Sequence, residues 1–258
     1  MTENYTENID MFRFEELINE LTRIYKNDYW LEEYNDKIGR NLNLNDQIKK
    51  YNLALYELDI ESWLVLKQKL IKKFNQPENN RGKYDFFSTM NEAFAYKYLK
   101  ISGSSKLKII VEGDKENPDI SYETNGKNEF CEVKTINISD QEIVKMNQSN
   151  KVQSDEDIYN IFHEGKELSI DCNKEYSKLS LGFFNKLKKD LEKASSQISK
   201  DNNGSGIIFI IIHFDDFTHY FIENYIESIK CYMRNEWNSL RVYFMIFSNE
   251  ECLYKHNM

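Results

Sequence analysis

The chain has 258 residues, which is long enough for one large domain or for a core domain with a smaller extension. Charged residues make up 30% and hydrophobic residues 40%, and the 14% aromatic content excludes an intrinsically disordered chain. The net charge of −9 is spread evenly along the sequence. A basic tail is therefore excluded, and a nucleic-acid partner would need a local basic patch.

The cysteines and the apolar stretches indicate in which cellular compartment the protein is expected. Cys131, Cys172, Cys231 and Cys252 are scattered without a C-x-x-C pair, which predicts buried free thiols in a reducing compartment. The acidic, polar start "MTENYTENID" predicts that there is no secretory signal. The longest apolar block, "IIFIII" at 207–212, is too short for a membrane span. We therefore expect a cytoplasmic protein with no membrane partner.

Residues 11–76 predict helices, because apolar residues recur in them at helical spacing. The segments that carry this spacing are "FEELINELTRIY", with Phe14, Leu17, Ile18, Leu21 and Ile24, and "SWLVLKQKLIKKF", with Trp63, Leu66, Leu70 and Phe74. The polar stretch 76–83, which contains Pro77, predicts a linker or a loop between subdomains. We accordingly expect an N-terminal helical region over 1–80 and a second domain over 81–258, which opens with a helix at 85–100.

After this helix, the period of the apolar residues changes from that of helices to that of strands. We expect strands at 106–113, 118–123 and 129–138. Asn125-Gly126 is a strong signal for a two-residue hairpin turn, because a type I′ turn needs positive φ at both central positions.

The C-terminal part predicts alternating helices and strands, after an irregular polar insertion at 139–175. A helix is expected at 180–200, with one apolar face formed by Phe184, Leu187, Leu191, Ala194 and Ile198. The run 206–214 is continuously apolar, as a strand covered on both faces would be. A helix at 220–233 joins it to a strand at 241–248, which predicts a parallel crossover. The fold class is therefore α/β, with a mixed sheet.

Two acids and a lysine fall together in "NPDISYETNGKNEFCEVKT" at 117–135. If Asn125-Gly126 forms the loop, Asp119 lies directly opposite Glu132, and Lys134 shares their face. Opposed carboxylates repel each other unless a positive charge lies between them, and Mg²⁺ takes such oxygen ligands. A lysine beside them can hold a phosphate or the attacking water, as in metal-assisted phosphodiester hydrolysis. The alternatives are a surface hairpin with solvated charges, or a register shifted by one residue, which would scatter the set.

Pro118-Asp119 followed by Glu132-Val133-Lys134 resembles the motif of the PD-(D/E)xK nuclease superfamily. The order of elements in the C-terminal two-thirds of the chain is also similar to the αβββαβ core of that restriction-endonuclease-like fold. The resemblance implies Mg²⁺, for which Mn²⁺ can substitute, bound by Asp119, Glu132 and the backbone carbonyl of Val133. It also implies that Lys134 assists the water or the transition state.

Many members of the superfamily add an acid from the helix that precedes the first strand. Glu92 in "MNEAFAY" matches that position, so the resemblance implies a further catalytic and metal-binding residue there. Glu112 and Asp114 are weaker candidates for the same role. A capping box formed by Thr89 and Glu92 explains the same spacing equally well, and both interpretations stay open.

A polar stripe flanks the apolar face of the helix expected at 180–200. Its members recur at intervals of three or four residues and are Lys186, Lys189, Lys193, Gln197 and Lys200. Such a stripe is ordinarily the solvated side of an amphipathic helix. Because this helix borders the active site in the superfamily, the resemblance implies that Gln197, Lys193 and Lys189 contact substrate.

The function implied is that of a metal-dependent endonuclease of restriction or defence type, with DNA favoured over RNA and a second copy of the chain as a possible partner. The alternative is a catalytically silent nucleic-acid- or protein-binding module that retains the fold. The complete acid–acid–lysine set favours the enzyme, whereas the acidic net charge opposes unspecific binding to phosphates.

Overall fold

The structure is a computed structural model that describes residues 12–37, 42–74, 83–113, 117–136, 178–201, 205–213, 222–247 and 252–256. The chain divides into two compact units, Met1–Asp114 with Ile120–Gly126 and Lys115–Asp119 with Lys127–Met258. The boundary expected near residue 80 falls inside the first of these units. The insertion expected at 139–175 lies outside the described residues, as does most of the expected linker.

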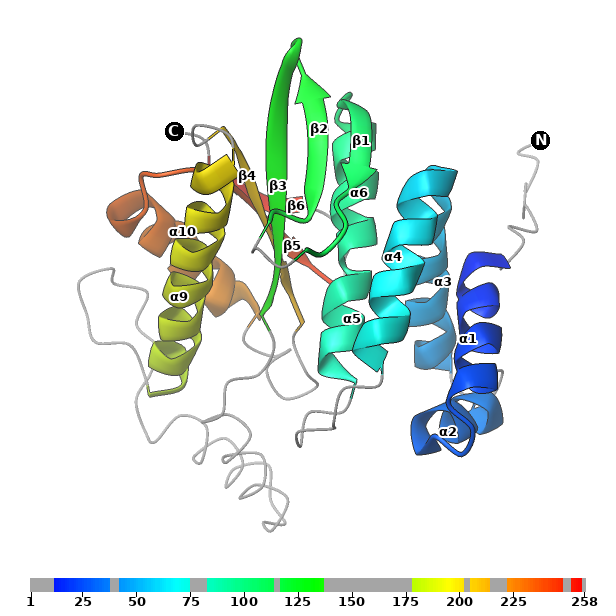
Figure 1. The fold of residues 1–258 in the computed structure, drawn as a ribbon. Coiled ribbons are helices and arrows are strands. Elements are labelled where there is room, and N and C mark those ends of the chain that lie inside the picture. The colour runs from blue at the N-terminus through cyan, green and yellow to red at the C-terminus, as the bar shows by residue number, and fades with distance from the viewer. Residues whose placement is uncertain are drawn as a thin grey trace, which may run out of the picture. The chain divides into compact units, whose positions relative to one another are not determined.

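The first unit contains helices followed by a pair of strands (Figure 1). Its elements are α1 (Phe12–Ile24), α2 (Tyr29–Lys37), α3 (Leu42–Tyr56), α4 (Ile60–Phe74), α5 (Tyr84–Met90), α6 (Glu92–Ile101), β1 (Ser105–Ile109) and β2 (Ile120–Thr124). Strands β1 and β2 are antiparallel. Helix α4 packs against α5, and α3 against α6. These contacts pack helices from both sides of residue 80 against one another.

The apolar spacing predicted most of that core correctly. All the residues expected to be apolar and buried in α1 and α4 are buried except Ile24, which lies at the end of α1 and is 50% exposed. The helix expected at 85–100 is divided at Asn91 into α5 and α6. The Asn91 side chain accepts a hydrogen bond from the Tyr51 hydroxyl (3.2 Å), a tertiary contact that helical periodicity does not reveal.

The second unit is of mixed α/β type. Its elements are β3 (Lys127–Ile136), α9 (Lys178–Asp201), β4 (Gly206–Ile212), α10 (Ile222–Glu236), β5 (Arg241–Ile246) and β6 (Cys252–His256). The strands pair in the order β3-β4-β5-β6. The pairs β3–β4 and β4–β5 are parallel, which confirms the predicted crossover, and β6 is antiparallel to β5. Strand β6 was not predicted, because a five-residue segment with mixed polarity carries little signal.

The turn between β2 and β3 has the predicted backbone. Asn125 has φ 49° and Gly126 has φ 74°, so both residues adopt the left-handed conformation that a type I′ turn requires. A second glycine is required for a different reason. A Cβ added to Gly206 would lie 2.2 Å from the Phe130 carbonyl oxygen, so the close approach of β3 and β4 at this point excludes a side chain.

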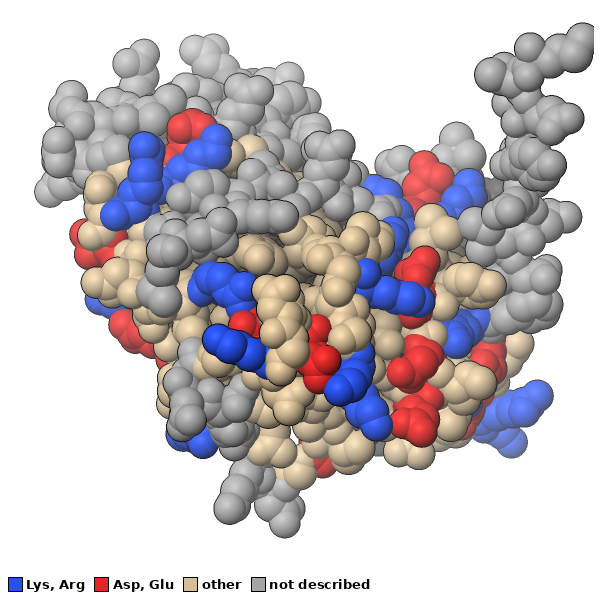
Figure 2. Space-filling model, turned by 90° about the horizontal axis from the view of Figure 1, so that it is seen from above, with Lys and Arg blue, Asp and Glu red and all other residues tan. Residues whose placement is uncertain are grey.

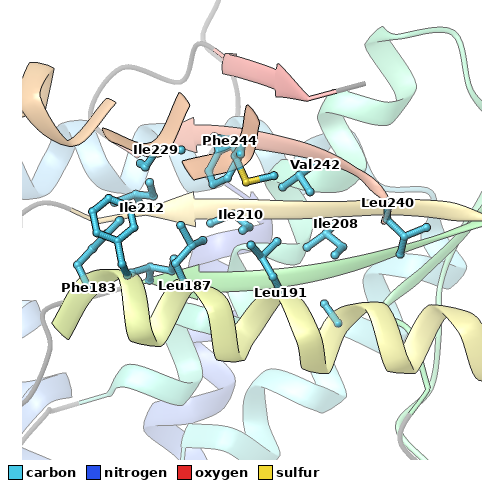
Figure 3. Close-up of a cluster of buried hydrophobic side chains, with 14 of the residues drawn as sticks. Phe183, Leu187, Leu191, Ile208, Ile210, Ile212, Ile229, Leu240, Val242 and Phe244 are labelled. Carbon is cyan, nitrogen blue, oxygen red and sulfur yellow. The ribbon is translucent and has the colours of Figure 1, made fainter. Parts of the chain in front are cut away.

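The core of the second unit lies between the strands and two helices (Figure 3). Leu187 and Leu191 of α9 point at alternate residues of β4, among them Ile208 and Ile210. Helix α10 adds Ile229 to the same cluster. The intervening residues of β4 are buried as well, so this strand is covered on both faces, as its continuous apolar run predicts.

The cysteines follow the sequence-based expectation in part. Cys131 is a buried thiol outside any disulfide, as predicted. Cys231 takes part in a disulfide, so the prediction of free thiols is wrong for this residue. Scattered cysteines reveal nothing about which of them the fold brings within bonding distance. Within the described ranges, no helix combines the length and the apolar character that crossing a membrane requires.

Candidate active site

Two of the expected site residues form an ion pair on one face of β3. Lys134 Nζ lies 2.5 Å from Glu132 Oε1, and the side chains are 17% and 3% exposed. Strand alternation puts both on the face that carries Ile136, which belongs to the core under α9. The pair is therefore held at the edge of an apolar cluster, where its charges are largely removed from water.

Asp119 lies one residue before β2 and is fixed against β3 by two hydrogen bonds. Its backbone N–H donates to the Cys131 carbonyl (3.1 Å), and its Oδ2 accepts from the Val133 N–H (2.8 Å). The predicted register placed Asp119 directly opposite Glu132, whereas its backbone bonds to Cys131.

This arrangement also orients the Val133 carbonyl. In an extended strand, the N–H and C=O of one residue point toward the same edge. The N–H of Val133 points toward Asp119, so its carbonyl points toward that edge as well. The backbone oxygen expected as a metal ligand therefore faces the side of β3 on which Asp119 lies.

Gln197 of α9 connects the lysine to the segment before β2. Its Oε1 accepts from Lys134 Nζ (3.2 Å), and its Nε2 donates to the Asn117 carbonyl (3.4 Å). The residue is 6% exposed, which is unusual for a polar residue on an amphipathic helix. The structure thus brings the predicted Gln197 together with Lys134.

Asp190 is a further acid near Lys134, and it is not among the residues predicted from the sequence. It lies on α9 seven residues before Gln197, a spacing of about two turns that puts both on the same side of the helix. Burial raises the pKa of Asp190, and Lys186, Lys134, Lys189 and Lys193, in that order, oppose this change. The spacing from Gln197 is the one signal in the sequence that could have identified it.

The pKa of Lys134 reflects the three acids around it. Burial is the largest single effect and lowers the pKa. The charge and hydrogen bond of Glu132, followed by the charges of Asp119 and Asp190, together exceed it and raise the pKa above its ordinary value. Lys134 is therefore cationic at neutral pH.

The lysines of the predicted stripe lie along the surface of α9. Lys189 and Lys193 are exposed, and Lys186 is half-buried. Their charges oppose the rise in the pKa of Asp190, an acid on the same helix. On the face of the molecule drawn in Figure 2, basic and acidic side chains are interspersed.

Glu92 has a different partner from either of those predicted. Its carboxylate forms an ion pair with Lys69 of α4 at 2.6 Å, and both side chains are 6% exposed. The capping-box interpretation is wrong: Thr89 lies inside α5, where its hydroxyl donates to the Asp85 carbonyl, and the residue at the N-terminal cap of α6 is Asn91. A role for Glu92 in metal binding stays a prediction.

Glu112 and Asp114 are the two weaker candidates for the further acidic metal ligand. Glu112 forms ion pairs with Lys72 and Lys73 (3.6 and 3.3 Å). Asp114 lies outside the described residues.

The oxygen donors near Lys134 suit a hard cation that keeps much of its water. Among the residues that the structure describes, no group of three or more His, Cys, Asp or Glu side chains could hold a metal ion. Mg²⁺, however, is usually held by one or two carboxylates, with water and substrate phosphate completing its shell. Asp119, Glu132 and the Val133 carbonyl fit that smaller set, although Glu132 Oε1 would have to release Lys134.

Comparison of the chain with protein-family models, with curated proteins and with solved structures found no match.

Gln197→Leu should lower the free energy of unfolding by about 1–3 kcal/mol, because it removes two hydrogen bonds and leaves the Asn117 carbonyl without its side-chain donor. Urea denaturation followed by circular dichroism measures the change. Lys200→Gln on the exposed side of the same helix is the control, with an expected change within about 0.5 kcal/mol. Equal stabilities of the two variants would contradict the bridging role of Gln197.

Because of His213, at the end of β4, we expect the stability of the protein to depend on pH. Its ring stacks on Phe247 (centroids 4.3 Å apart), and burial lowers the pKa of the imidazole from 6.5 to about 4. The unfolded chain therefore binds a proton at higher pH than the folded chain. This contribution to stability is fully present above the ordinary pKa of 6.5 and is lost as the pH falls toward 4, at up to about 1.4 kcal/mol per pH unit.

The comparison is with His213→Phe, which keeps an aromatic ring against Phe247. Between pH 7 and 5, stability should fall less steeply in the variant than in the wild type when both are measured by urea denaturation. Parallel curves would show that His213 does not titrate in this way.

Proposed function

We propose that this protein is a metal-dependent nuclease that hydrolyses phosphodiester bonds, with DNA as its favoured substrate and a restriction-endonuclease-like core as its catalytic domain. The observation that carries the proposal is the buried Glu132–Lys134 pair beside Asp119. Burying charged groups is costly unless they are paired. Acids and a lysine gathered in this way are typical of a site in which the charges act on a substrate.

In this proposal Asp119, Glu132 and the Val133 carbonyl hold the cation. Glu92 is a further predicted ligand, and it would have to leave Lys69 to take part. Mg²⁺, when bound, supplies Lewis-acid activation of water and of a phosphate oxygen. The hydrogen bond from the Val133 N–H keeps the Asp119 carboxylate in one orientation. Lys134 holds a positive charge close to where negative charge develops on the phosphate, and its partial burial strengthens that interaction.

The direct test is incubation of the purified protein with plasmid DNA, single-stranded DNA and RNA in the presence of Mg²⁺, Mn²⁺ or EDTA. We expect cleavage with either metal, none with EDTA, and the highest rate on DNA. If no substrate is cut and calorimetry detects no Mn²⁺ binding, the nuclease proposal fails.

Lys189 and Lys193 of α9 are proposed to bind substrate phosphates. Lys189→Ala with Lys193→Ala should weaken DNA binding, measured in EDTA so that the DNA is not cut. The dependence of binding on salt should become shallower by about 0.9 in log–log slope for each phosphate that the variant no longer neutralises. A double variant of equal charge, Lys188→Ala with Lys230→Ala, should change the slope less. If both double variants show the same salt dependence, Lys189 and Lys193 do not bind phosphate and are ordinary surface residues.

A catalytically silent binding module is the second candidate. In its favour, the Glu132 carboxylate is already matched by the Lys134 ammonium, so this pair can exist without a cation. Such a module would bind DNA equally well with EDTA and with Mn²⁺ and would cut under neither condition. A nuclease would bind Mn²⁺ in the absence of DNA.

A further inference from the structure

Glu129, near the start of β3, is a buried acid that the proposed site does not use. Its Oε1 accepts a hydrogen bond from the hydroxyl of Ser205, directly before β4 (3.3 Å). Its Oε2 forms an ion pair with Arg241, the first residue of β5. The residue is 8% exposed, and burying a carboxylate is costly unless it is paired and hydrogen-bonded. One side chain thus connects the beginnings of three neighbouring strands.

The apolar pattern of β4 does not by itself specify its register on β3. Residues 207–212 read IIFIII, and all of them are buried. Because side chains alternate between two faces, a shift by two residues keeps every side chain on its own face. Along most of the strand it also replaces one large apolar side chain by another. A further interaction is therefore needed to select the observed register, in which Cys131 pairs with Ile207.

The close approach of β3 and β4 leaves two registers. Gly206 pairs with Phe130, and a Cβ added there would lie 2.2 Å from the Phe130 carbonyl oxygen. A shift by one residue in either direction, or by two residues in one direction, would bring a residue with a Cβ to this point. A shift by two residues in the other direction would bring Gly204, which has none. Steric exclusion alone therefore admits this shifted register beside the observed one.

We propose that Glu129 is a positioning residue that selects the observed register of the parallel strands. In the shifted register β4 lies about 7 Å further along β3, so the Ser205 hydroxyl is out of reach of the carboxylate. The ion pair with Arg241 holds β5 to β3 in the same way. Buried ion pairs add little to stability, but specifying register is a role that they can have.

The register of β4 also determines the geometry of the candidate site. Helix α9 ends at Asp201 and β4 begins at Gly206, and the two elements share one apolar core. A shift of β4 along β3 therefore carries α9 with it. Gln197 of α9 would then no longer meet Lys134 of β3, to which it is hydrogen-bonded in the observed register. This link to catalysis rests on the proposed function, whereas the choice of register does not.

Cross-linking to the buried thiol of Cys131 measures the register. In the observed register Cys131 pairs with Ile207, so Ile207→Cys can form a disulfide with it in oxidised glutathione. The Cα of position 205 is then about 8 Å from that of Cys131, beyond the ~7 Å limit for bridging. In the shifted register position 205 lies directly opposite, so Ser205→Cys is the variant that cross-links. Mass spectrometry of the digested full chain quantifies both products.

Removing the carboxylate should change the ratio of the two cross-links. We expect Glu129→Ala to raise the ratio of the 205 product to the 207 product at least about tenfold, because both ties are lost. Glu129→Gln should raise it less, since its amide oxygen can still accept from Arg241, and it serves if Glu129→Ala does not fold. Ile229→Ala is the control, because it weakens the core without touching Glu129. It should change both cross-links alike and leave the ratio within about twofold.

An unchanged ratio in Glu129→Ala and in Glu129→Gln would overturn the inference. So would an equal change in Ile229→Ala, because Glu129 would then contribute stability without selecting a register. Cleavage tests the positioning role: protein cross-linked at 205 should cut plasmid DNA at least about tenfold more slowly than protein cross-linked at 207. Equal rates would reject that role. A wild type that does not cut at all would reject the proposed function alone, since the cross-link ratio needs neither metal nor DNA.

Discussion

Asp119→Ala is expected to reduce metal-dependent cleavage at least about 1,000-fold, which corresponds to ~4 kcal/mol of transition-state stabilisation. The variant removes one of the two carboxylates proposed to hold the cation. Mn²⁺ affinity, measured by calorimetry, should fall in parallel with cleavage of plasmid DNA. Cleavage at the wild-type rate would show that Asp119 is not a metal ligand.

The stability of the same variant separates chemistry from folding. Asp119 Oδ2 accepts from the Val133 N–H, so Asp119→Ala should lower the free energy of unfolding by about 1 kcal/mol. Relief of repulsion between opposed carboxylates, the effect expected from the predicted register, is outweighed by this loss. Asp119→Asn is the matched control, because its amide oxygen can still accept from Val133. It should fold with nearly wild-type stability and still fail to cut.

Lys134→Met is expected to have the second large effect, on both activity and stability. Cleavage should fall about 100- to 1,000-fold, because the ammonium no longer stabilises charge on the phosphate. In the metal-free protein, removing one partner of a buried ion pair leaves Glu132 without its counter-ion and should cost about 3 kcal/mol. Thermal or urea denaturation in EDTA measures this cost.

Added metal should reverse the loss of stability but not the loss of activity. Mn²⁺ supplies the positive charge that Lys134 no longer provides, so it should stabilise Lys134→Met more than it stabilises the wild type. The double variant Glu132→Gln with Lys134→Met should regain stability in EDTA and lose this response to Mn²⁺. If Mn²⁺ stabilises wild type and Lys134→Met equally, the lysine and the cation do not compete for Glu132.

Short-range sequence patterns were sufficient to predict much of the structure of the second unit. Because side chains alternate between the two faces of a strand, Glu132 and Lys134 of β3 share a face, and their ion pair at 2.5 Å agrees with this. The apolar face of α9 is the buried one, as its helical spacing predicts. These outcomes follow from local geometry, since strand and helix periods are the same in every fold.

Other features depend on contacts between distant segments. The Asp119 backbone N–H bonds to the Cys131 carbonyl and its side chain accepts from the Val133 N–H, contacts that counting outward from the turn does not predict. Glu92 pairs with Lys69 from a helix 23 residues earlier, which no spacing rule indicates. The packing of α4 on α5 joins segments from both sides of residue 80 in the first unit.

Local patterns in the sequence were enough to predict the order of the described elements from α6 to β5, the turn at Asn125-Gly126 and the faces of β3 and α9. Tertiary packing, in contrast, buries the Glu132–Lys134 pair and brings Gln197 of α9 against Lys134. The physical reason is that periodicity specifies which way a side chain points from its own backbone. Which charge it meets there depends on how α9 packs across β3, and this is set by the apolar contacts of the whole cluster.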